Sequence, residues 1–480
     1  MNTVDVPAAP LTHLTLVEAA DGISSGAFSA VELAGAAFKA FKAGDGALNS
    51  AIALEEAEAL EAAAALDKER KAGRLRGLLH GVPLAHKDMY YRAGKITTCG
   101  SEVRRDFRPT YTSTAIARLE SAGSITLGTL NMAEFAQNPT GHNAHFGHCR
   151  NPWHTDYCPG GSSSGSGAAV AARFIYGALG SDTGGSIRMP ASMCGVTGIK
   201  PTQTRVSRYG AMPLSFMADN VGPLARTARD CARLLKVLAG YDPADPTSAK
   251  EPVPDYEAAL DGDIRGMRIG IPTNFFFDDA DTDVVRAVDA AAEVLSSRGA
   301  TVVRIAIPHM DAIGTYGAVI SRVEGSTIHA QWMRTRPQDY SIALGARFYA
   351  GLSIPAAYYI EALSRRGPIL RALGREVFDK VDAFVTPTIR IKTPTLAATD
   401  IDAGAPGAID AFNMLTANTR AINYMGLPAV SVPCGFDDDA LPIGFQVVGR
   451  PFAEGRILRI ADAYQRDTDW HRRRPTLRAA

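Results

Sequence analysis

The sequence predicts an α/β fold in one large domain, and three observations support this. Residues 267–271 and 301–305 are short apolar runs typical of strands, and a helical pattern lies between them. This strand–helix–strand order indicates a parallel pair in a buried sheet. Further strand-like runs at 384–386, 429–432 and 444–449 continue toward the end of the chain. We therefore expect one structural unit rather than a catalytic domain with an independent partner domain.

Helical patterns flank these strands. Residues 1–75 are expected to form an N-terminal helical segment packed on a catalytic domain of residues 76–480. Within it, residues 50–71 are rich in Ala, Glu and Leu, which favour a helix. Residues 168–176 predict an apolar helix after a serine-rich run, and residues 310–375 are mostly helical.

The composition is that of a soluble globular protein. Hydrophobic residues make up 46% of the chain and charged residues 21%. The 50 basic side chains equal the 50 acidic ones, so charge does not indicate nucleic acid or an anionic membrane as a partner. No apolar run approaches the roughly 18 residues of a membrane span.

The cysteines and the N-terminus indicate a cytoplasmic protein. The six cysteines include no C-x-x-C pair and are too sparse for a disulfide scaffold. We therefore expect reduced, mostly buried thiols. Residues 1–16 lack a basic segment followed by an apolar stretch, so no signal peptide is expected.

Three separate segments carry the residues of a serine nucleophile. Lys87 ends Gly-Val-Pro-Leu-Ala-His-Lys, Ser162 opens a Gly/Ser run, and Ser186 follows Asp-Thr-Gly-Gly. A serine hydroxyl is a weak nucleophile until a base takes its proton. A lysine can be that base if burial lowers its pKa, and an intermediate hydroxyl can pass the proton along.

Residues 183–186 also meet a second requirement of acyl transfer. A tetrahedral intermediate needs backbone N–H donors aimed at its oxyanion. Consecutive glycines allow successive amides to converge on one point and allow a substrate to approach the backbone closely.

Together these segments resemble the amidase signature family. The Gly/Ser motif is Gly-Gly-Ser-Ser-Ser-Gly-Ser-Gly at 160–167, and the nucleophile motif is Gly-Ser-Asp-Thr-Gly-Gly-Ser-Ile-Arg at 180–188. The resemblance spans roughly residues 10–470 and includes further motifs at 81–88, 151–153 and 426–429.

The resemblance implies a Ser–cis-Ser–Lys triad in a large mixed sheet flanked by helices. Ser186 would be the acylated nucleophile, Ser162 a relay after a cis peptide bond, and Lys87 the base. Ser164 stands where several members have glycine, which leaves Ser163 as an alternative to Ser162. The amides of Thr183, Gly184, Gly185 and Ser186 would form the oxyanion hole, and the supporting residues would be Ser163, Asp182 and Arg188.

Competing motifs are weaker. Residues 22–26 and 161–165 fit G-x-S-x-G, but the first lies in a helical region and the second is better explained as the relay loop. The Gly/Ser run lacks the lysine of a phosphate-binding loop. Histidines and cysteines between His142 and Cys158 suit zinc, yet they lie in a loop-like segment, so we expect neither metal nor cofactor.

The resemblance predicts an amide hydrolase acting on a small to medium carboxamide, anilide or carbamate. The alternative is the glutaminase (A) subunit of a tRNA-dependent amidotransferase. Arg347 resembles the arginine with which that subunit binds a carboxylate. This alternative also calls for an acidic residue that holds the glutamine amino group, and Thr416 stands at its position. A hydroxyl anchors an ammonium poorly, which favours a stand-alone amidase. A non-catalytic binding protein of the same family is a third possibility.

We expect a small-molecule amide as the partner, no nucleic acid and no membrane, with a homodimer left open. The substrate pocket is expected to come from residues 130–145, 310–360 and 400–420. Its candidate apolar lining consists of Tyr340, Phe348, Tyr349, Tyr358, Tyr359 and Met414, although such stripes belong more often to the core.

Overall fold

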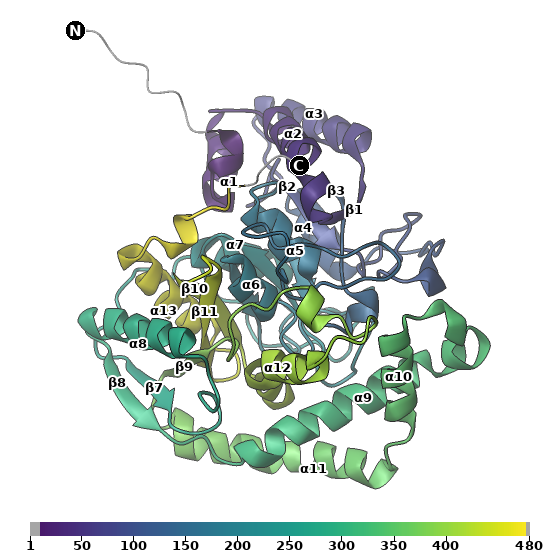
Figure 1. The fold of residues 1–480 in the computed structure, drawn as a ribbon. Coiled ribbons are helices and arrows are strands. Elements are labelled where there is room, and N and C mark those ends of the chain that lie inside the picture. Colours follow the sequence, from purple (N-terminus) through teal and green to yellow (C-terminus); the bar gives the residue numbers. More distant parts are fainter. Residues whose placement is uncertain (1–9, 477–480) are drawn as a thin grey trace.

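One mixed sheet of 11 strands runs through the computed structural model, which describes residues 10–476 (Figure 1). The strands are β1 (Ala51–Leu54), β2 (Pro83–Lys87), β3 (Ile125–Leu130), β4 (Gly177–Ser181), β5 (Thr197–Lys200), β6 (Val221–Ala225), β7 (Arg268–Pro272), β8 (Thr301–Ile305), β9 (Ala383–Pro387), β10 (Ala429–Phe436) and β11 (Pro442–Gly449). Their order across the sheet is β1-β3-β2-β4-β6-β5-β10-β11-β9-β7-β8. The predicted α/β fold with a mixed sheet is confirmed.

Helices surround this sheet. They are α1 (Leu16–Ser25), α2 (Ala30–Leu48), α3 (Glu56–Lys71), α4 (Thr114–Ser121), α5 (Ser164–Ala171), α6 (Arg188–Cys194), α7 (Ala228–Leu238), α8 (Thr282–Ser297), α9 (Met310–Thr335), α10 (Ile342–Leu352), α11 (Ala356–Leu373), α12 (Ala408–Met425) and α13 (Glu454–Asp467). The predicted parallel pair is β7 and β8, with α8 as the connecting helix.

The central strands have residues buried on both faces. β10 and β11 pair antiparallel and are buried almost throughout, which explains why both are largely apolar, with Ser431 and Gln446 as their polar residues. β2 lies between β3 and β4 and is parallel to both. Its last residue is Lys87, so the sheet itself carries this side chain into the interior.

Two predicted helices have different bounds. The expected helix at 50–71 divides into β1 and α3, and β1 pairs antiparallel with β3. The helix expected at 168–176 is α5, which begins within the serine run at Ser164 and ends at Ala171. All of α5 is buried and built from small residues, which allows the close approach of neighbouring backbone.

Helices α9 to α11 occupy the predicted helical region and form a long edge of the molecule (Figure 1). α9 packs against α10, α11 and α12. This group brings residues far along the chain toward the pocket that contains Ser186.

All six cysteines are buried free thiols, as expected. No helix within residues 10–476 has the length and apolar character needed to cross a membrane. The expectation about a signal peptide concerns residues 1–16, of which the first nine lie outside the described residues.

Candidate active site

Lys87 is the buried centre of the site. Its side chain is 1% exposed, and Nζ donates hydrogen bonds to Ser162 Oγ at 2.7 Å and Ser181 Oγ at 2.9 Å. Burial lowers the pKa of Lys87 to about 7, although the carboxylates of Asp182 and Asp219 act in the opposite direction. A substantial fraction of Lys87 is therefore neutral near pH 7, as a general base must be.

Ser162 contacts Lys87 directly, while Ser163 has a different partner. The peptide bond between Gly161 and Ser162 is cis, as the resemblance implies. Ser163 Oγ exchanges hydrogen bonds with the backbone of Ser181, at 3.3 Å each. Of the two serines, Ser162 therefore has the contact that a relay needs, and Ser163 has that of a support. Ser181 was not singled out from the sequence, where it is an ordinary strand residue.

Ser186 lies at the edge of the interior and lines a pocket. It is 7% exposed, whereas Ser162 is fully buried. Within residues 10–476, no hydrogen bond joins Ser186 to Ser162 or Lys87. Catalytic hydrogen bonds are often long without substrate and tighten only in the complex, so this geometry does not exclude a relay.

An ion pair between Asp182 and Arg188 holds the loop that carries Ser186. Arg188 is fully buried, and its Nε lies 3.0 Å from Asp182 Oδ2. Arg188 also donates to Asn423 on α12 and Gln446 on β11. Burial alone would raise the pKa of Asp182, but Arg188 outweighs it and holds that pKa at about 2. The two flanking residues thus fix the loop that carries Ser186, and their role as supporting residues of a reaction stays a prediction.

The four amides proposed for an oxyanion hole are not equivalent. The Gly185 amide donates to Asp182 Oδ1 at 2.8 Å, so it already has a partner. Among the described residues, the amides of Thr183, Gly184 and Ser186 have none. A Cβ at Gly184 would meet nothing within 4 Å, which leaves space for a substrate beside this backbone. The candidate donors are therefore Thr183, Gly184 and Ser186, and Gly185 instead anchors the loop.

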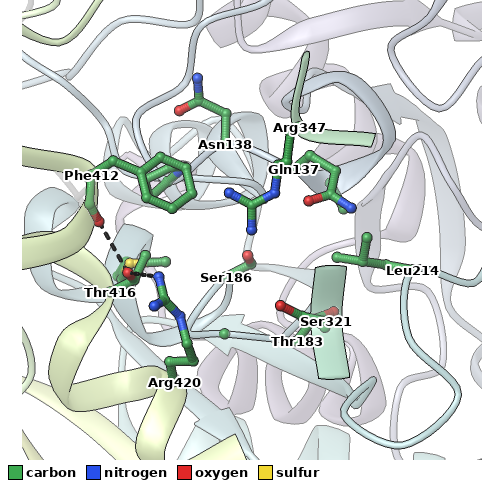
Figure 2. Close-up of a pocket in the computed structure, with 14 residues that line it drawn as sticks. Gln137, Asn138, Thr183, Ser186, Leu214, Ser321, Arg347, Phe412, Thr416 and Arg420 are labelled. Carbon is green, nitrogen blue, oxygen red and sulfur yellow. Dashed lines mark hydrogen bonds between the residues drawn. The ribbon is translucent and has the colours of Figure 1, made fainter. Parts of the chain in front are cut away.

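The pocket at Ser186 has about 40 Å³ of open space and is lined by residues from several segments (Figure 2). It opens beside a larger cavity of about 330 Å³ that shares Gln137, Asn138, Arg347 and Phe412 with it. The smaller pocket is lined by Ala136, Gln137, Asn138, Pro139, Thr183, Gly184, Ser186, Met189, Leu214, Ser321, Arg347, Phe412, Thr416 and Arg420.

The predicted pocket stretches contribute, but the six side chains named as a candidate apolar lining do not, and for Tyr340 and Phe348 the alternative of a core position holds. Residues from 130–145, 310–360 and 400–420 all line one or both cavities. The six named side chains line neither. Tyr340 and Phe348 pack instead around the buried ring of His329, and Tyr349 and Tyr358 face solvent. The sequence distinguishes poorly between an apolar pocket wall and an apolar core, since both use the same residue types.

The histidine-rich segment brings together only part of the suggested metal cluster. His142, His148 and Asp400 have potential ligand atoms within 4.8 Å of one another. Both ring nitrogens of His142 already have partners, the Thr140 hydroxyl at 2.6 Å and the Leu396 carbonyl at 3.1 Å. This arrangement is explained by hydrogen bonds of His142 to its own loop and to the segment that contains Leu396.

Comparisons with known proteins agree with the fold. The amidase family model matches residues 32–458. The glutamyl-tRNA(Gln) amidotransferase (A) subunit from Chloroflexus aggregans is 41% identical over 492 residues, covering 98% of this chain and 99% of the relative. One solved structure has a TM-score of 0.88 at 34% identity and covers 94% of this chain and 98% of its own. It is described as belonging to a vestigial protein complex that reveals the evolutionary origins of an s-triazine catabolic enzyme. The structure of peptide amidase from Stenotrophomonas maltophilia has a TM-score of 0.83 at 31% identity. The match covers 98% of this chain and 99% of the peptide amidase chain.

The fold and these matches define an enzyme of the class that hydrolyses carbon–nitrogen bonds. The chain belongs to the amidase family. The resemblance drawn from its sequence motifs is thereby confirmed.

Proposed function

We propose that this protein hydrolyses an amide bond of a small molecule through an acyl-enzyme on Ser186. The observation that carries the proposal is the buried contact of 2.7 Å between Lys87 Nζ and Ser162 Oγ, with the pKa of Lys87 lowered to about 7 by burial. Lys87 lies beside two serine hydroxyls, and no carboxylate among the described residues is hydrogen-bonded to it. This environment is typical of a general base rather than of a lysine in a structural ion pair.

In the proposed reaction, neutral Lys87 accepts the Ser162 proton while Ser162 accepts that of Ser186. Ser186 Oγ then forms a bond to the carbonyl carbon, and the carbonyl oxygen takes the negative charge. The proton returns through Ser162 to the amide nitrogen, the C–N bond breaks, and the amine leaves. Water, deprotonated through the same relay, attacks the acyl-enzyme and releases the acid.

The oxyanion would be held by the amides of Thr183, Gly184 and Ser186. The ion pair between Asp182 and Arg188 fixes the loop before substrate arrives, so these donors need little reorganisation. Mutational data on comparable donors indicate that losing one costs about 100- to 1000-fold in rate.

The second candidate is the glutaminase (A) subunit of a tRNA-dependent amidotransferase. The names of the curated relatives support it more than a stand-alone amidase, and their identity of 41% extends over nearly the whole chain. The pocket favours the stand-alone enzyme, because Thr416 occupies the position of the expected acidic residue and no described Asp or Glu lines the pocket at Ser186.

Product release from a panel of amides separates these two functions. The panel contains glutamine, aliphatic primary amides, an aryl anilide, an aryl carbamate and an ester, each with Ser186→Ala as the control. Turnover of a non-glutamine amide that disappears in the variant supports the stand-alone amidase. Turnover of glutamine alone, or only after partner subunits are added, supports the glutaminase component.

Covalent labelling tests the third possibility. A fluorophosphonate should label Ser186 and leave folded Ser186→Ala unlabelled. Absence of labelling in the folded protein would contradict the proposed nucleophile and favour a non-catalytic binding protein.

A further inference from the structure

Another cavity, separate from the site of Ser186, has basic side chains in its wall. It has about 400 Å³ of open space and shares no lining residue with the pocket at Ser186 or with the larger cavity beside that pocket. Three parts of the chain meet around it: the first described residues, the end of α5, and the last described residues, which lie beside α2 (Figure 1). The lining residues are Thr12, His13, Ala40, Ala171, Ala172, Arg173, Arg474, Pro475 and Thr476, with no Asp or Glu of residues 10–476 among them.

Arg173 lies at the centre of this wall, two residues after the end of α5. Its φ is +62°, a left-handed conformation that is uncommon for arginine. Its guanidinium donates to the His13 carbonyl at 3.1 Å and to the Arg472 carbonyl at 2.9 Å. Its Nε is buried and has no hydrogen-bond partner in the described chain. Neutral carbonyl groups therefore hold the side chain in place, and its charge has no counterion.

His13 shows how positive the cavity is. Arg474 Nη1 lies 2.7 Å from His13 Nδ1, so the neutral imidazole is the acceptor of this contact. Burial lowers the pKa of His13, and the charges of Arg474, Arg173 and Arg226 lower it further. Three arginines thus disfavour one more positive charge at this position.

Arg226 adds a buried charge behind Arg173. Both arginines line a narrow neighbouring space. Arg226 donates to the carbonyl groups of Leu14 and Ile175, and its Nε has no partner among residues 10–476. Burial lowers the pKa of Arg226 to about 9, and Arg173 contributes to this shift. Within the described chain, none of Arg173, Arg226 and Arg474 forms an ion pair. Buried charges without a counterion are costly, so this cluster calls for an anion.

The acidic groups whose charge reaches these arginines are engaged with backbone amides. Glu18 accepts from the Thr15 amide at 2.8 Å, in the cap of α1. Asp230 accepts from the Val17 amide at 3.0 Å, and burial raises its pKa to about 6. The two carboxylates offset the repulsion only in part, because burial and Arg474 lower the pKa of Arg173 although Glu18 acts in the opposite direction.

We infer that this cavity binds a small soluble phosphate compound, with its phosphate group between Arg173 and Arg474 and beside His13. Arginine donates paired, charge-assisted hydrogen bonds to phosphate oxygens. A phosphate dianion neutralises two of these cations, whereas a carboxylate neutralises one. The rest of the wall is built largely of alanine and proline, which leaves space for a small organic group. The inference is independent of the proposed hydrolysis at Ser186.

Calorimetric titration tests the inference with inorganic phosphate and pyrophosphate as probes. Potassium chloride holds the ionic strength constant, because salt screens such interactions. We expect saturable binding of one anion per chain, with pyrophosphate tighter than phosphate. Failure of both probes to bind would overturn the inference. Binding of a mixed-sequence oligonucleotide without binding of either probe would also overturn it and would indicate a nucleic acid surface.

Arg474→Gln is the most informative variant. Arg474 is exposed, and His13 is its one side-chain partner in the described chain, so the fold should persist. We expect Kd for pyrophosphate to rise at least about tenfold, as charge-assisted hydrogen bonds are lost. Arg474→Lys should keep part of the affinity. An unchanged Kd in Arg474→Gln would contradict the assignment.

Arg472→Gln is the matched control. It removes the same charge two residues earlier, from a side chain that lines neither basic space. Kd should therefore stay within about twofold of the unmodified protein. A loss of affinity equal to that of Arg474→Gln would show that only the overall charge of this segment matters and would overturn the site.

Arg173→Gln needs a readout that separates binding from stability, because it also loses the two carbonyl contacts. Its thermal midpoint without anion measures the structural part, and the rise in midpoint on adding pyrophosphate measures binding. Phosphate also stabilises proteins by exclusion from their surface, so the rise is compared with that of Arg472→Gln. We expect the site-specific rise to disappear in Arg173→Gln, and an undiminished rise would contradict the role of Arg173.

The anion can also be located directly. Crystals soaked in tungstate, a tetrahedral dianion like phosphate, should show anomalous scattering between Arg173 and Arg474. Tungstate found only at other positions would overturn the inference. Ser186→Ala should bind pyrophosphate as the unmodified protein does, whatever its amide turnover. The anion site and the proposed hydrolase can therefore each fail without the other.

Discussion

At the scale of single residues, the proposed chemistry depends on one buried lysine. Lys87 ends a central strand, and burial there lowers its pKa to about 7. We predict that kcat/KM rises with pH through about 7 and then levels off, because the neutral lysine is the base and its fraction increases with pH. Initial rates measured from about pH 5.5 to about pH 9 give this profile.

A neighbouring carboxyl group requires a control in that experiment. Burial raises the pKa of Asp88 to about 7, so it titrates in the same range. His86 does not, because burial lowers its pKa to about 3. Asp88→Asn should keep the transition near pH 7, and Lys87→Ala should lose it along with most amide turnover. A transition centred at about pH 10 in the unmodified protein, the ordinary range of a lysine, would contradict the assignment.

The sequence singles out individual residues where a local motif surrounds them, and the catalytic roles of these residues stay predictions. Ser162 and Ser186 could be named in advance because each lies in a distinctive Gly/Ser-rich run, and Lys87 because it ends a distinctive Gly-Val-Pro segment. The contact of Ser181 with Lys87 could not be predicted, because it joins segments that are distant in the sequence.

At the scale of elements, backbone contacts decide where the reactive loop lies. A Cβ on Gly165 in α5 would collide with the Ser50 carbonyl oxygen and would lie 2.6 Å from the Asn131 amide nitrogen. We predict that Gly165→Ala destabilises the protein by about 1–3 kcal/mol and reduces turnover, because α5 must shift and it begins just after Ser162. The thermal midpoint and kcat measure both effects.

The same substitution elsewhere provides a matched control. Gly35 lies inside α2, and a Cβ there would meet nothing within 4 Å. Gly35→Ala should stabilise by about 0.5–1 kcal/mol and leave turnover unchanged, because alanine has the higher helix propensity. Equal effects at both glycines would show that the contacts of Gly165 do not matter.

Contacts between segments that are far apart in the sequence explain why the predicted bounds of two helices were wrong. Residues 51–54 are Ala-Ile-Ala-Leu, which fits a helix locally, yet they form β1 because β3 offers an antiparallel partner. Likewise, α5 begins within a Gly/Ser run of low helix propensity, because burial between sheet and α6 decides the conformation. The strands at 267–271 and 301–305 were predictable because their pattern is local.

At the scale of the whole molecule, the six free thiols are spread over the buried interior. Burial raises the pKa of Cys99 and Cys158 to about 12, so little thiolate is present at neutral pH. We predict that Ellman's reagent modifies none of them in the native protein within minutes and all six in denaturant. Prompt modification of any thiol under native conditions would contradict this burial.

The residues proposed for catalysis and the two arginines that line the pocket at Ser186 come from different parts of the chain. The residues proposed to break the bond lie between 87 and 188, whereas α10 and α12, which supply Arg347 and Arg420, come after residue 340. The two parts are nevertheless joined, because Thr419 and Asn423 on α12 form hydrogen bonds with the loop that carries Ser186, so replacements on α12 also reach the position of the proposed nucleophile.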